Sequence, residues 1–460
     1  MKAVRLLLMI ILAGLAAGST ASGEEKGRKL PVSAYIKSAK IEILSSHSDR
    51  YKTAMALLDS LFINYGPHAE GLFLMGQIMV DGIEATTGLK EKSTFLAGMV
   101  AYFDSLKMCC RNEGIKKNYR ENCDEFIPIA DSLKVKYWRQ FFNAGLEQWT
   151  RAEGLQNDLG TATDSSSRAL MEADIRGNLD SCIQNMMLCI TAIGDSARPY
   201  LIIDKAFGLK GEYRAGIEWL NKGFTVSDDP GTIQLSIAYD FIQMDDYCGA
   251  IPYYRDYVKD HPGDAGTLTN LAICYNNCGL YDSALSAYRT ILSLEPENSE
   301  ILANIGLYFN TLAREAADSA TFYRQANNEK LVGVWNDKRT QAFDSSRAYF
   351  RKAFQFNPAD VAVAEQYGVV CAILGDYENA ITGFKQAAEQ QPQEADYWLS
   401  LGDCYVSLKK FEDAVGSYEK VVQLKPDNVA VWEHLLDLYL ETGQTAKRAE
   451  AEKRLKELQQ

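Results

Sequence analysis

The sequence contains few of the residues on which most active sites depend. It has only four histidines in 460 residues, and none stands in an H-E-x-x-H or H-x3-H spacing that would suit a metal. The motifs G-x-S-x-G, G-x4-G-K-[ST], G-x-G-x-x-G and C-x-x-C are absent as well. Because each of these chemistries needs its own constellation of reactive side chains, we predict a protein without catalytic activity, cofactor or metal ion.

Proline is also scarce, with 11 residues and no Pro-, Gly- or Ser-rich tract that would mark an interdomain linker. A chain of 460 residues is nevertheless too long for one core, because single cores stop growing near about 250 to 300 residues. A repeat array grows in one dimension and escapes this limit. The hydrophobic fraction of 47% and the charged fraction of 24% are typical of a folded protein, so we favour the array.

The first residues are typical of a secretory signal peptide. Lys2 and Arg5 form a short positive region, an apolar run covers 6–17, and small residues fill 18–23. This order predicts a signal peptide over 1–21. The alternative is an uncleaved anchor, but the run is shorter than the roughly 20 residues that cross a bilayer. We therefore expect export to the periplasm or cell envelope, or secretion, with no membrane insertion after signal cleavage.

Acidic residues outnumber basic ones, 61 against 48, and the formal net charge is −13. Removal of the predicted signal peptide would take away two basic residues and make the charge −15. Nucleic acids and anionic membrane surfaces are bound mainly through lysine and arginine, so we do not expect nucleic acid as a ligand. A neutral or basic protein or peptide is the partner that this charge favours.

A repeat of 34 residues runs through the C-terminal half of the chain. In the repeat that begins at residue 395, the marker residues stand at positions 4, 7, 8, 11, 20, 24 and 32; they are Trp398, Leu401, Gly402, Tyr405, Ala414, Tyr418 and Pro426. Much of the same order recurs in repeats that begin at residues 231, 265 and 361. The pattern resembles the tetratricopeptide repeat (TPR), whose signature is W-x2-L-G-x2-Y, then A-x3-F, then P.

The resemblance implies a pair of antiparallel helices in each repeat. Small residues at positions 8 and 20 allow the two helices to approach closely, and large residues at 4, 11 and 24 fill the space beside them. Prolines at position 32 end the second helix because proline cannot continue it. The predicted fold is all-α: a right-handed α-solenoid of about nine or ten stacked TPR-like helical hairpins, several of them with insertions.

The register divides the chain into blocks of different regularity. Three intervals between repeats exceed 34 residues, by about 35, 25 and 28 residues in chain order; these are explained either by lengthened helices or loops, or by insertions that form a binding surface. The stretch 87–135 has no clear register. The blocks are the signal peptide 1–21, divergent repeats with insertions over 22–196, TPR repeats over 197–298, a repeat with an insertion over 299–360, two well-matched repeats over 361–428, and a last repeat with a capping helix over 429–460.

Ten cysteines in an exported protein raise the question of disulfide bonds. Cys182 and Cys189 stand at small packing positions of their repeat, and Cys371 replaces the usual aromatic residue at position 11. A thiol at such positions acts as a small apolar side chain. Cys248 would begin a second helix and Cys278 would end the next first helix, so stacking predicts a Cys248–Cys278 bridge. Cys123 could also pair with Cys109 or Cys110.

The resemblance implies that the first helices line a concave groove. Position 6 of successive repeats faces it and is occupied by Ser236, Asn270, Asn304, Gln366, Ser400 and His434, with Asn276, Asn310 and Asp403 nearby. Because an amide both donates and accepts hydrogen bonds, such a row suits the backbone of an extended peptide. TPR domains that clamp a terminal carboxylate use lysine and arginine in this groove, and position 6 has neither. The alternative is that these are ordinary polar residues on a solvated helix face.

We therefore expect a non-catalytic scaffold or adaptor that binds a protein or peptide in the concave groove. One alternative is an assembly or secretion accessory factor of the cell envelope. Another is a hydrolase or carbohydrate-binding protein with a site in the N-terminal insertions.

Overall fold

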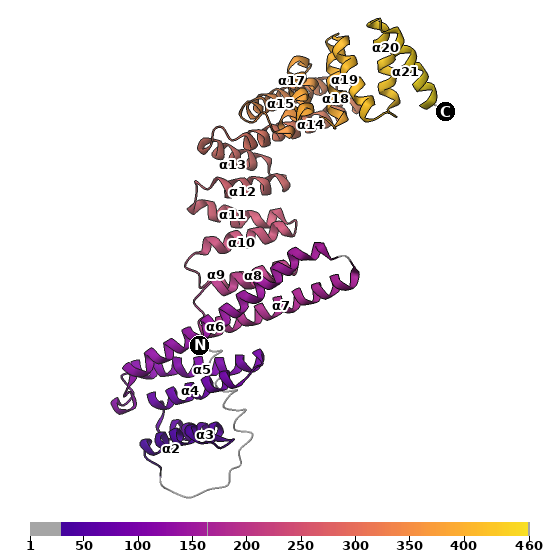
Figure 1. Cartoon of the computed structure of the whole chain (residues 1–460). Coiled ribbons are helices and arrows are strands. Elements are labelled where there is room, and N and C mark those ends of the chain that lie inside the picture. Colours follow the sequence, from indigo (N-terminus) through magenta and orange to yellow (C-terminus); the bar gives the residue numbers. More distant parts are fainter. Residues whose placement is uncertain (1–28, 163, 459–460) are drawn as a thin grey trace. The chain divides into compact units, whose positions relative to one another are not determined.

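The computed structural model describes residues 29–162 and 164–458 (Figure 1). Among these residues the regular structure consists of 20 α-helices and two short 3-10 turns, with no strand. The predicted all-α repeat architecture is confirmed. The predicted signal peptide, 1–21, lies outside the described residues. No helix in the described part of the chain is both long and apolar enough to cross a bilayer.

The chain divides into two compact units, Met1–Asp245 and Asp246–Gln460, which are called unit 1 and unit 2 below. The division falls inside the block 197–298 and separates helix α10 from helix α11. Each unit has its own packed helices and is described by itself.

Unit 1 consists of four helix pairs followed by a ninth helix, α10, which packs on α9. Its helices are α2 (Val32–Leu44), α3 (Arg50–Tyr65), α4 (Ala69–Ala85), α5 (Leu89–Arg111), α6 (Cys123–Asp158), α7 (Ser165–Ala192), α8 (Arg198–Leu209), α9 (Tyr213–Phe224) and α10 (Pro230–Gln243). The interval without a clear register contains α5, a 3-10 turn over Lys117–Tyr119 and the start of α6.

Unit 2 begins with α11 and continues with five helix pairs in chain order (Figure 1). Its helices are α11 (Tyr247–Asp260), α12 (Ala265–Asn277), α13 (Tyr281–Leu294), α14 (Ser299–Gln325), α15 (Glu329–Phe356), α16 (Val361–Ile373), α17 (Tyr377–Gln390), α18 (Ala395–Ser407), α19 (Phe411–Leu424), α20 (Val429–Glu441) and α21 (Thr445–Leu458).

Short polar side chains start the helices of unit 2. The carboxylate of Asp264, for example, accepts the backbone N–H of Thr267 at 3.0 Å and so satisfies one of the unpaired amides in the first turn of α12. The side chains of four other cap residues accept the same bond from the backbone N–H three positions later; they are Asn298, Asn328, Asp360 and Asn428. These caps fix where α12, α14, α15, α16 and α20 begin.

The turn inside each hairpin of unit 2 contains a left-handed residue. Gly279 and Gly375 supply it with φ of 71° and 75°, a region that glycine enters without steric cost. In the α18–α19 turn Lys409 takes the same conformation, with φ of 57°. At the other end of the repeats, α13 and α19 stop two residues before Pro296 and Pro426, as the sequence predicts.

A close contact between a glycine and an aromatic ring holds the hairpins together. A Cβ on Gly402 of α18 would lie 2.3 Å from Cε1 of Tyr418 on α19, so the ring rests on bare backbone. Equivalent contacts are Gly76 with Phe103, Gly306 with Phe350, and Gly368 with Phe384. The markers predicted at positions 8 and 24 therefore do meet in space.

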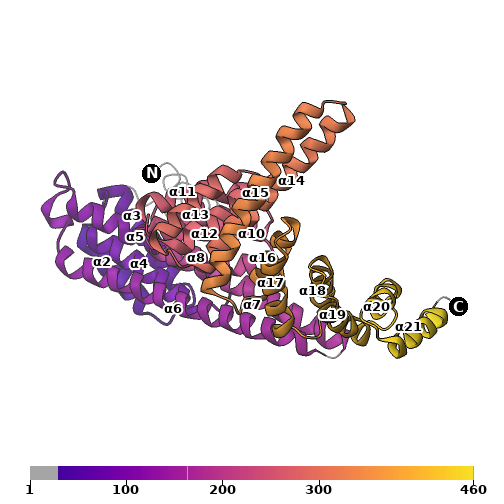
Figure 2. The ribbon, with the colours of Figure 1, turned by 90° about the horizontal axis from the view of Figure 1, so that it is seen from above.

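The insertion in block 299–360 lengthens the helices of one hairpin. The contact between Gly306 and Phe350 is kept. Helices α14 and α15 are 27 and 28 residues long, whereas α12 and α13 have 13 and 14 residues. The additional residues lie at the tip of the hairpin, which projects past its neighbours in unit 2 (Figure 2). Lengthened helices, rather than a loop, thus account for this interval.

We expect Gly402→Ala to lower the free energy of unfolding of unit 2 by about 1 to 3 kcal/mol, because the added methyl group overpacks the Tyr418 ring. Gly416→Ala is the matched control, since a Cβ at this exposed position of α19 meets nothing within 4 Å. It should stabilise α19 slightly, by roughly 0.5 to 1 kcal/mol. Chemical denaturation followed by circular dichroism measures both, and equal effects of the two substitutions would contradict the contact.

Candidate functional site

The polar row predicted at position 6 is distributed over successive first helices of unit 2. The helices α12, α14, α16, α18 and α20 each carry one member of the row; in that order they are Asn270, Asn304, Gln366, Ser400 and His434. Ser236, the remaining member, lies on α10 and belongs to unit 1.

Three members of the row have free amide groups. Asn270 is exposed, and Asn304 and Gln366 are half-buried. None of these three side chains takes part in a hydrogen bond with another described residue. Ser400, by contrast, donates its hydroxyl to the carbonyl of Asp396 one turn earlier, at 3.0 Å. Three consecutive first helices therefore offer donors and acceptors that the protein itself leaves unused.

The three predicted residues beside the row have partners within the fold. Nδ2 of Asn276 donates to the hydroxyl of Tyr288 at 2.8 Å. Oδ1 of Asn310 accepts the hydroxyl of Ser346 at 2.7 Å. These bonds join the first helix of a hairpin to its second helix, so both side chains support the hairpin that carries the row.

Asp403 makes a bond of the same kind at the C-terminal end of unit 2. Its Oδ1 accepts the hydroxyl of Tyr418 at 2.6 Å, which ties α18 to α19. The ring of His434 on α20 stacks on the ring of Tyr418, with centroids 5.7 Å apart and planes at 17°. Tyr418 therefore connects three successive helices through its hydroxyl and its ring.

Neighbouring first helices also touch directly. The hydroxyl of Tyr397 on α18 donates to Oε2 of Glu365 on α16 at 3.2 Å, next to Gln366. Glu365 on α16 and Asp403 on α18 add negative charge to the helices that carry Gln366 and Ser400, and position 6 itself has no lysine or arginine. Such a face can pair with the backbone of an extended peptide and attract basic side chains.

We expect Tyr418→Phe to reduce the stability of unit 2 by about 1 kcal/mol, because the ring packing is kept and only the hydrogen bond to Asp403 is lost. Tyr377→Phe on α17 is the control, since its hydroxyl bonds to no described residue, and it should change stability by much less. Urea denaturation of the two variants makes the comparison. A loss that is as large for Tyr377→Phe would refute the role of the bond.

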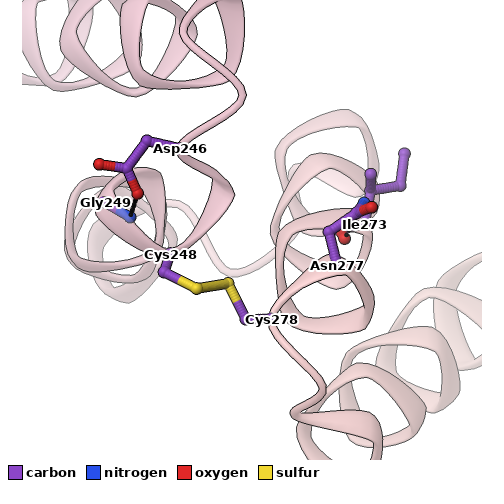
Figure 3. The surroundings of a disulfide bond; sticks show 6 residues. All are labelled: Asp246, Cys248, Gly249, Ile273, Asn277 and Cys278. Carbon is purple, nitrogen blue, oxygen red and sulfur yellow. Dashed lines mark hydrogen bonds between the residues drawn. A yellow bond between two sulfur atoms is a disulfide. The ribbon is translucent and has the colours of Figure 1, made fainter.

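A disulfide bond joins Cys248 to Cys278 (Figure 3), the two cysteines paired in the sequence analysis, with Cα atoms 5.6 Å apart. Cys248 lies in the first turn of α11, where the carboxylate of Asp246 accepts the backbone N–H of Gly249 at 2.8 Å. Cys278 directly follows α12. The bridge thus fixes the start of one helix to the end of the next.

A second disulfide bond joins Cys110 at the end of α5 to Cys123 at the start of α6, with Cα atoms 5.9 Å apart. The adjacent Cys109 is a buried free thiol. Five other free cysteines are buried as well: Cys182, Cys189, Cys274, Cys371 and Cys404. Burial raises the pKa of the Cys371 thiol to about 11, so it stays protonated and packs as a small apolar group.

Replacement of both Cys248 and Cys278 by alanine should lower the stability of unit 2 by about 3 kcal/mol, because the open loop has more entropy in the unfolded chain. The paired substitution of Cys110 and Cys123 is the control and should leave unit 2 unchanged. Non-reduced peptide maps of the wild-type protein should show both cross-links. A map in which Cys248 is a free thiol would rule out the bridge.

One group of buried polar residues in unit 1 was not predicted from the sequence. Asp204 on α8 and Asp240 on α10 are both buried and line a cavity that Ser236 also borders. The signal for Asp204 was present, since it replaces the small residue expected at position 8 of its repeat. Nothing in the repeat pattern marked Asp240.

Comparison with known proteins supports the repeat assignment. Models of the tetratricopeptide repeat match residues 265–298 and 373–429. The photosystem I assembly protein Ycf3 of Prochlorococcus marinus (strain NATL1A) is 29% identical over 104 residues, which are 22% of this chain and 56% of that protein. Human tetratricopeptide repeat protein 13 is 25% identical over 199 residues, 40% of this chain and 22% of that protein. The matches thus span about half or less of the lengths of these relatives.

Among solved structures, the C-terminal part of a TPR repeat-containing protein from Cytophaga hutchinsonii has 16% sequence identity and a TM-score of 0.41, over 57% of this chain and 95% of that chain. The two matched segments coincide with helices α12–α13 and with the stretch from the end of α16 to the start of α20. They match the register read from the sequence, and the same helical hairpins recur through the described residues. Residues 265–298 and 373–429 are therefore similar to the tetratricopeptide repeat, and the described residues form a multi-repeat stack of helical hairpins.

Proposed function

We propose that this protein is an exported, non-catalytic scaffold that holds an extended segment of a protein partner along the first helices of unit 2. The observation that carries this proposal is the row of free amides of Asn270, Asn304 and Gln366 on three consecutive first helices. Each amide offers both a donor and an acceptor, and together they match the alternating N–H and C=O groups of a peptide backbone. Main-chain pairing of this kind gives affinity with little dependence on sequence.

Charge supports a neutral or basic partner. The whole chain has a formal net charge of −13, and Glu365 and Asp403 stand beside the row. Complementary charge speeds encounter and selects among partners more than it adds affinity. A carboxylate clamp is not part of the proposal, because position 6 has no cationic side chain for a terminal carboxylate.

Export to the periplasm or cell envelope is the second part of the proposal. It is supported by the signal-like composition of the first residues. The disulfide bonds Cys110–Cys123 and Cys248–Cys278 also favour an oxidising compartment, because thiols are kept reduced in most cytosols.

A role in assembly of a larger complex is the second candidate. It is favoured by the similarity to a protein named for photosystem I assembly and by the lengthened α14–α15 hairpin, whose tip projects past its neighbours in unit 2 (Figure 2). In this role the scaffold would hold several components at once, one on the first helices and another on the projecting hairpin.

The experiment is affinity capture from cell-envelope extracts, identification of the captured protein by mass spectrometry, and direct titration of its bound segment. Replacement of Asn270 and Asn304 by alanine should weaken binding about tenfold or more, because two hydrogen bonds of roughly 1 kcal/mol each are lost. Gln390→Ala is the matched control, since it removes an exposed amide from the end of α17, a second helix. Equal affinity of the double variant and the control would place the partner elsewhere.

A further inference from the structure

Unit 1 contains a cavity of about 610 Å³ between helices α6, α8 and α10 and the start of α9. Its size is that of a small-ligand site. Asp204 and Asp240 belong to its lining and are 6% and 3% exposed. Trp149, Tyr213 and Tyr239 contribute aromatic surface to its lining. The cavity therefore combines apolar walls with two buried carboxyl groups.

The two carboxyl groups meet at a glycine. A Cβ on Gly216 of α9 would lie 2.5 Å from Oδ1 of Asp204 and 3.3 Å from Oδ2 of Asp240, so both groups rest against the same bare backbone. These two oxygens are buried, and among the described residues neither accepts a hydrogen bond from a donor outside the carboxyl pair. Neither carboxyl group has a lysine or arginine within salt-bridge distance in this part of the chain.

A shared proton accounts for two adjacent buried carboxyl groups without a cation. Burial raises the pKa of Asp240 far above that of an ordinary carboxyl group, and the hydrogen bond to Asp204 and the charge of Asp204 raise it further. Burial raises the pKa of Asp204 too, but the hydrogen bond from Asp240 and the charge of Lys205 oppose the shift. Near neutral pH the pair therefore carries one proton and one negative charge.

Packing alone gives no reason for this pair. In four other hairpins the first helix carries a glycine at position 8, and an aromatic ring of the second helix packs on it; the glycines are Gly76, Gly306, Gly368 and Gly402. Asp204 stands at this position in the α8–α9 hairpin, where a small apolar residue would avoid the cost of burying a charge. A buried charge that opens into a cavity with aromatic walls points instead to a ligand that carries the opposite charge.

The indole of Trp149 adds a second requirement. Its Nε1–H is buried and has no acceptor among the described residues. The carboxyl pair thus lacks a cation within salt-bridge distance and the indole lacks an acceptor. A peptide with a basic side chain supplies both, the acceptor being a backbone carbonyl. A free amine would supply only the cation.

We propose that this cavity binds a lysine or arginine side chain of a polypeptide, whose cation takes the place of the proton shared by Asp204 and Asp240. The aromatic walls pack on the alkyl stem of that side chain, since long basic side chains bury their methylene groups against apolar surface. This site lies in unit 1 and does not depend on the amide row of unit 2.

The test uses the full-length protein and four blocked pentapeptides of alanine with one central residue: arginine, lysine, citrulline or norleucine. Isothermal titration calorimetry at pH 7 should show that the arginine or lysine peptide binds about tenfold or more tightly than the uncharged two. Titration in buffers of different ionisation heat should show about one proton released per peptide. Equal affinity for arginine and citrulline, or binding without proton release, overturns the proposal.

Substitutions locate the effect. Asp240→Asn keeps a donor to Asp204 but removes one carboxyl group, so affinity for the arginine peptide should fall roughly 30-fold and proton release should disappear. Glu218→Gln, an exposed change on α9 outside the cavity, is the control. Wild-type behaviour of Asp240→Asn would refute the site. Because proton release is measured on the wild-type protein, the test does not depend on the folding of a variant.

Two further arms separate the remaining sources of charge. Agmatine and cadaverine carry the cation without a backbone carbonyl, and binding of either as tightly as the peptides would overturn the assignment to a polypeptide.

Each titration is repeated with Lys205→Met, because the other titratable groups that line the cavity also affect the carboxyl pair. Those groups are Glu153 on α6, Lys205 on α8, Tyr213 on α9 and Tyr239 on α10. Loss of proton release in Lys205→Met would overturn the assignment of the proton to the carboxyl pair.

Discussion

The contact between a glycine on the first helix and a ring on the second is the constraint on which this structure depends. Where Gly402 meets Tyr418 or Gly306 meets Phe350, the helices come close enough for the ring to rest on bare backbone. Dispersion and the removal of apolar area from water stabilise that arrangement. A hairpin cannot bury both of its faces alone, so each one is completed by its neighbour in the stack.

Because this contact lies in the body of the hairpin, chain length can vary at the tip. The helices α14 and α15 lengthen without moving it, and in unit 1 the equivalent contact of Gly76 with Phe103 is kept although α5 has 23 residues. The same constraint decides which polar groups are free. Asn276 and Asp403 bond to tyrosines of the second helix, whereas the side chain of Asn270 is exposed and bonds to no other described residue.

The α8–α9 hairpin reverses the roles of its two helices. Here the bare backbone belongs to Gly216 on the second helix, and the side chain that rests on it is Asp204 of the first helix, joined by Asp240 of the next. An aromatic ring at such a contact gains stability from burial, but a carboxyl pair there is costly unless a proton or a cation neutralises part of its charge. The geometry that packs the other hairpins thus creates a charged cavity in this one.

The sequence by itself determined the repeat, through its 34-residue period. It also determined where many helices end, because turn glycines and prolines such as Pro296 act on the few residues around them. The sequence did not decide whether block 299–360 contains lengthened helices or a loop, because the interval between two repeats gives a length but not a conformation. Which polar residues are free was decided only by the tertiary structure. Asn276 and Asn270 belong to the same helix, but only Asn276 lies within hydrogen-bond distance of a tyrosine on the next helix. Asp204 stood out as an exception in its repeat, but Asp240 did not, and their meeting over Gly216 depends on three helices packed at close range. Local sequence patterns show how a residue affects its own helix. Two carboxyl groups on different helices, such as those of Asp204 and Asp240, come together only when the helices stack.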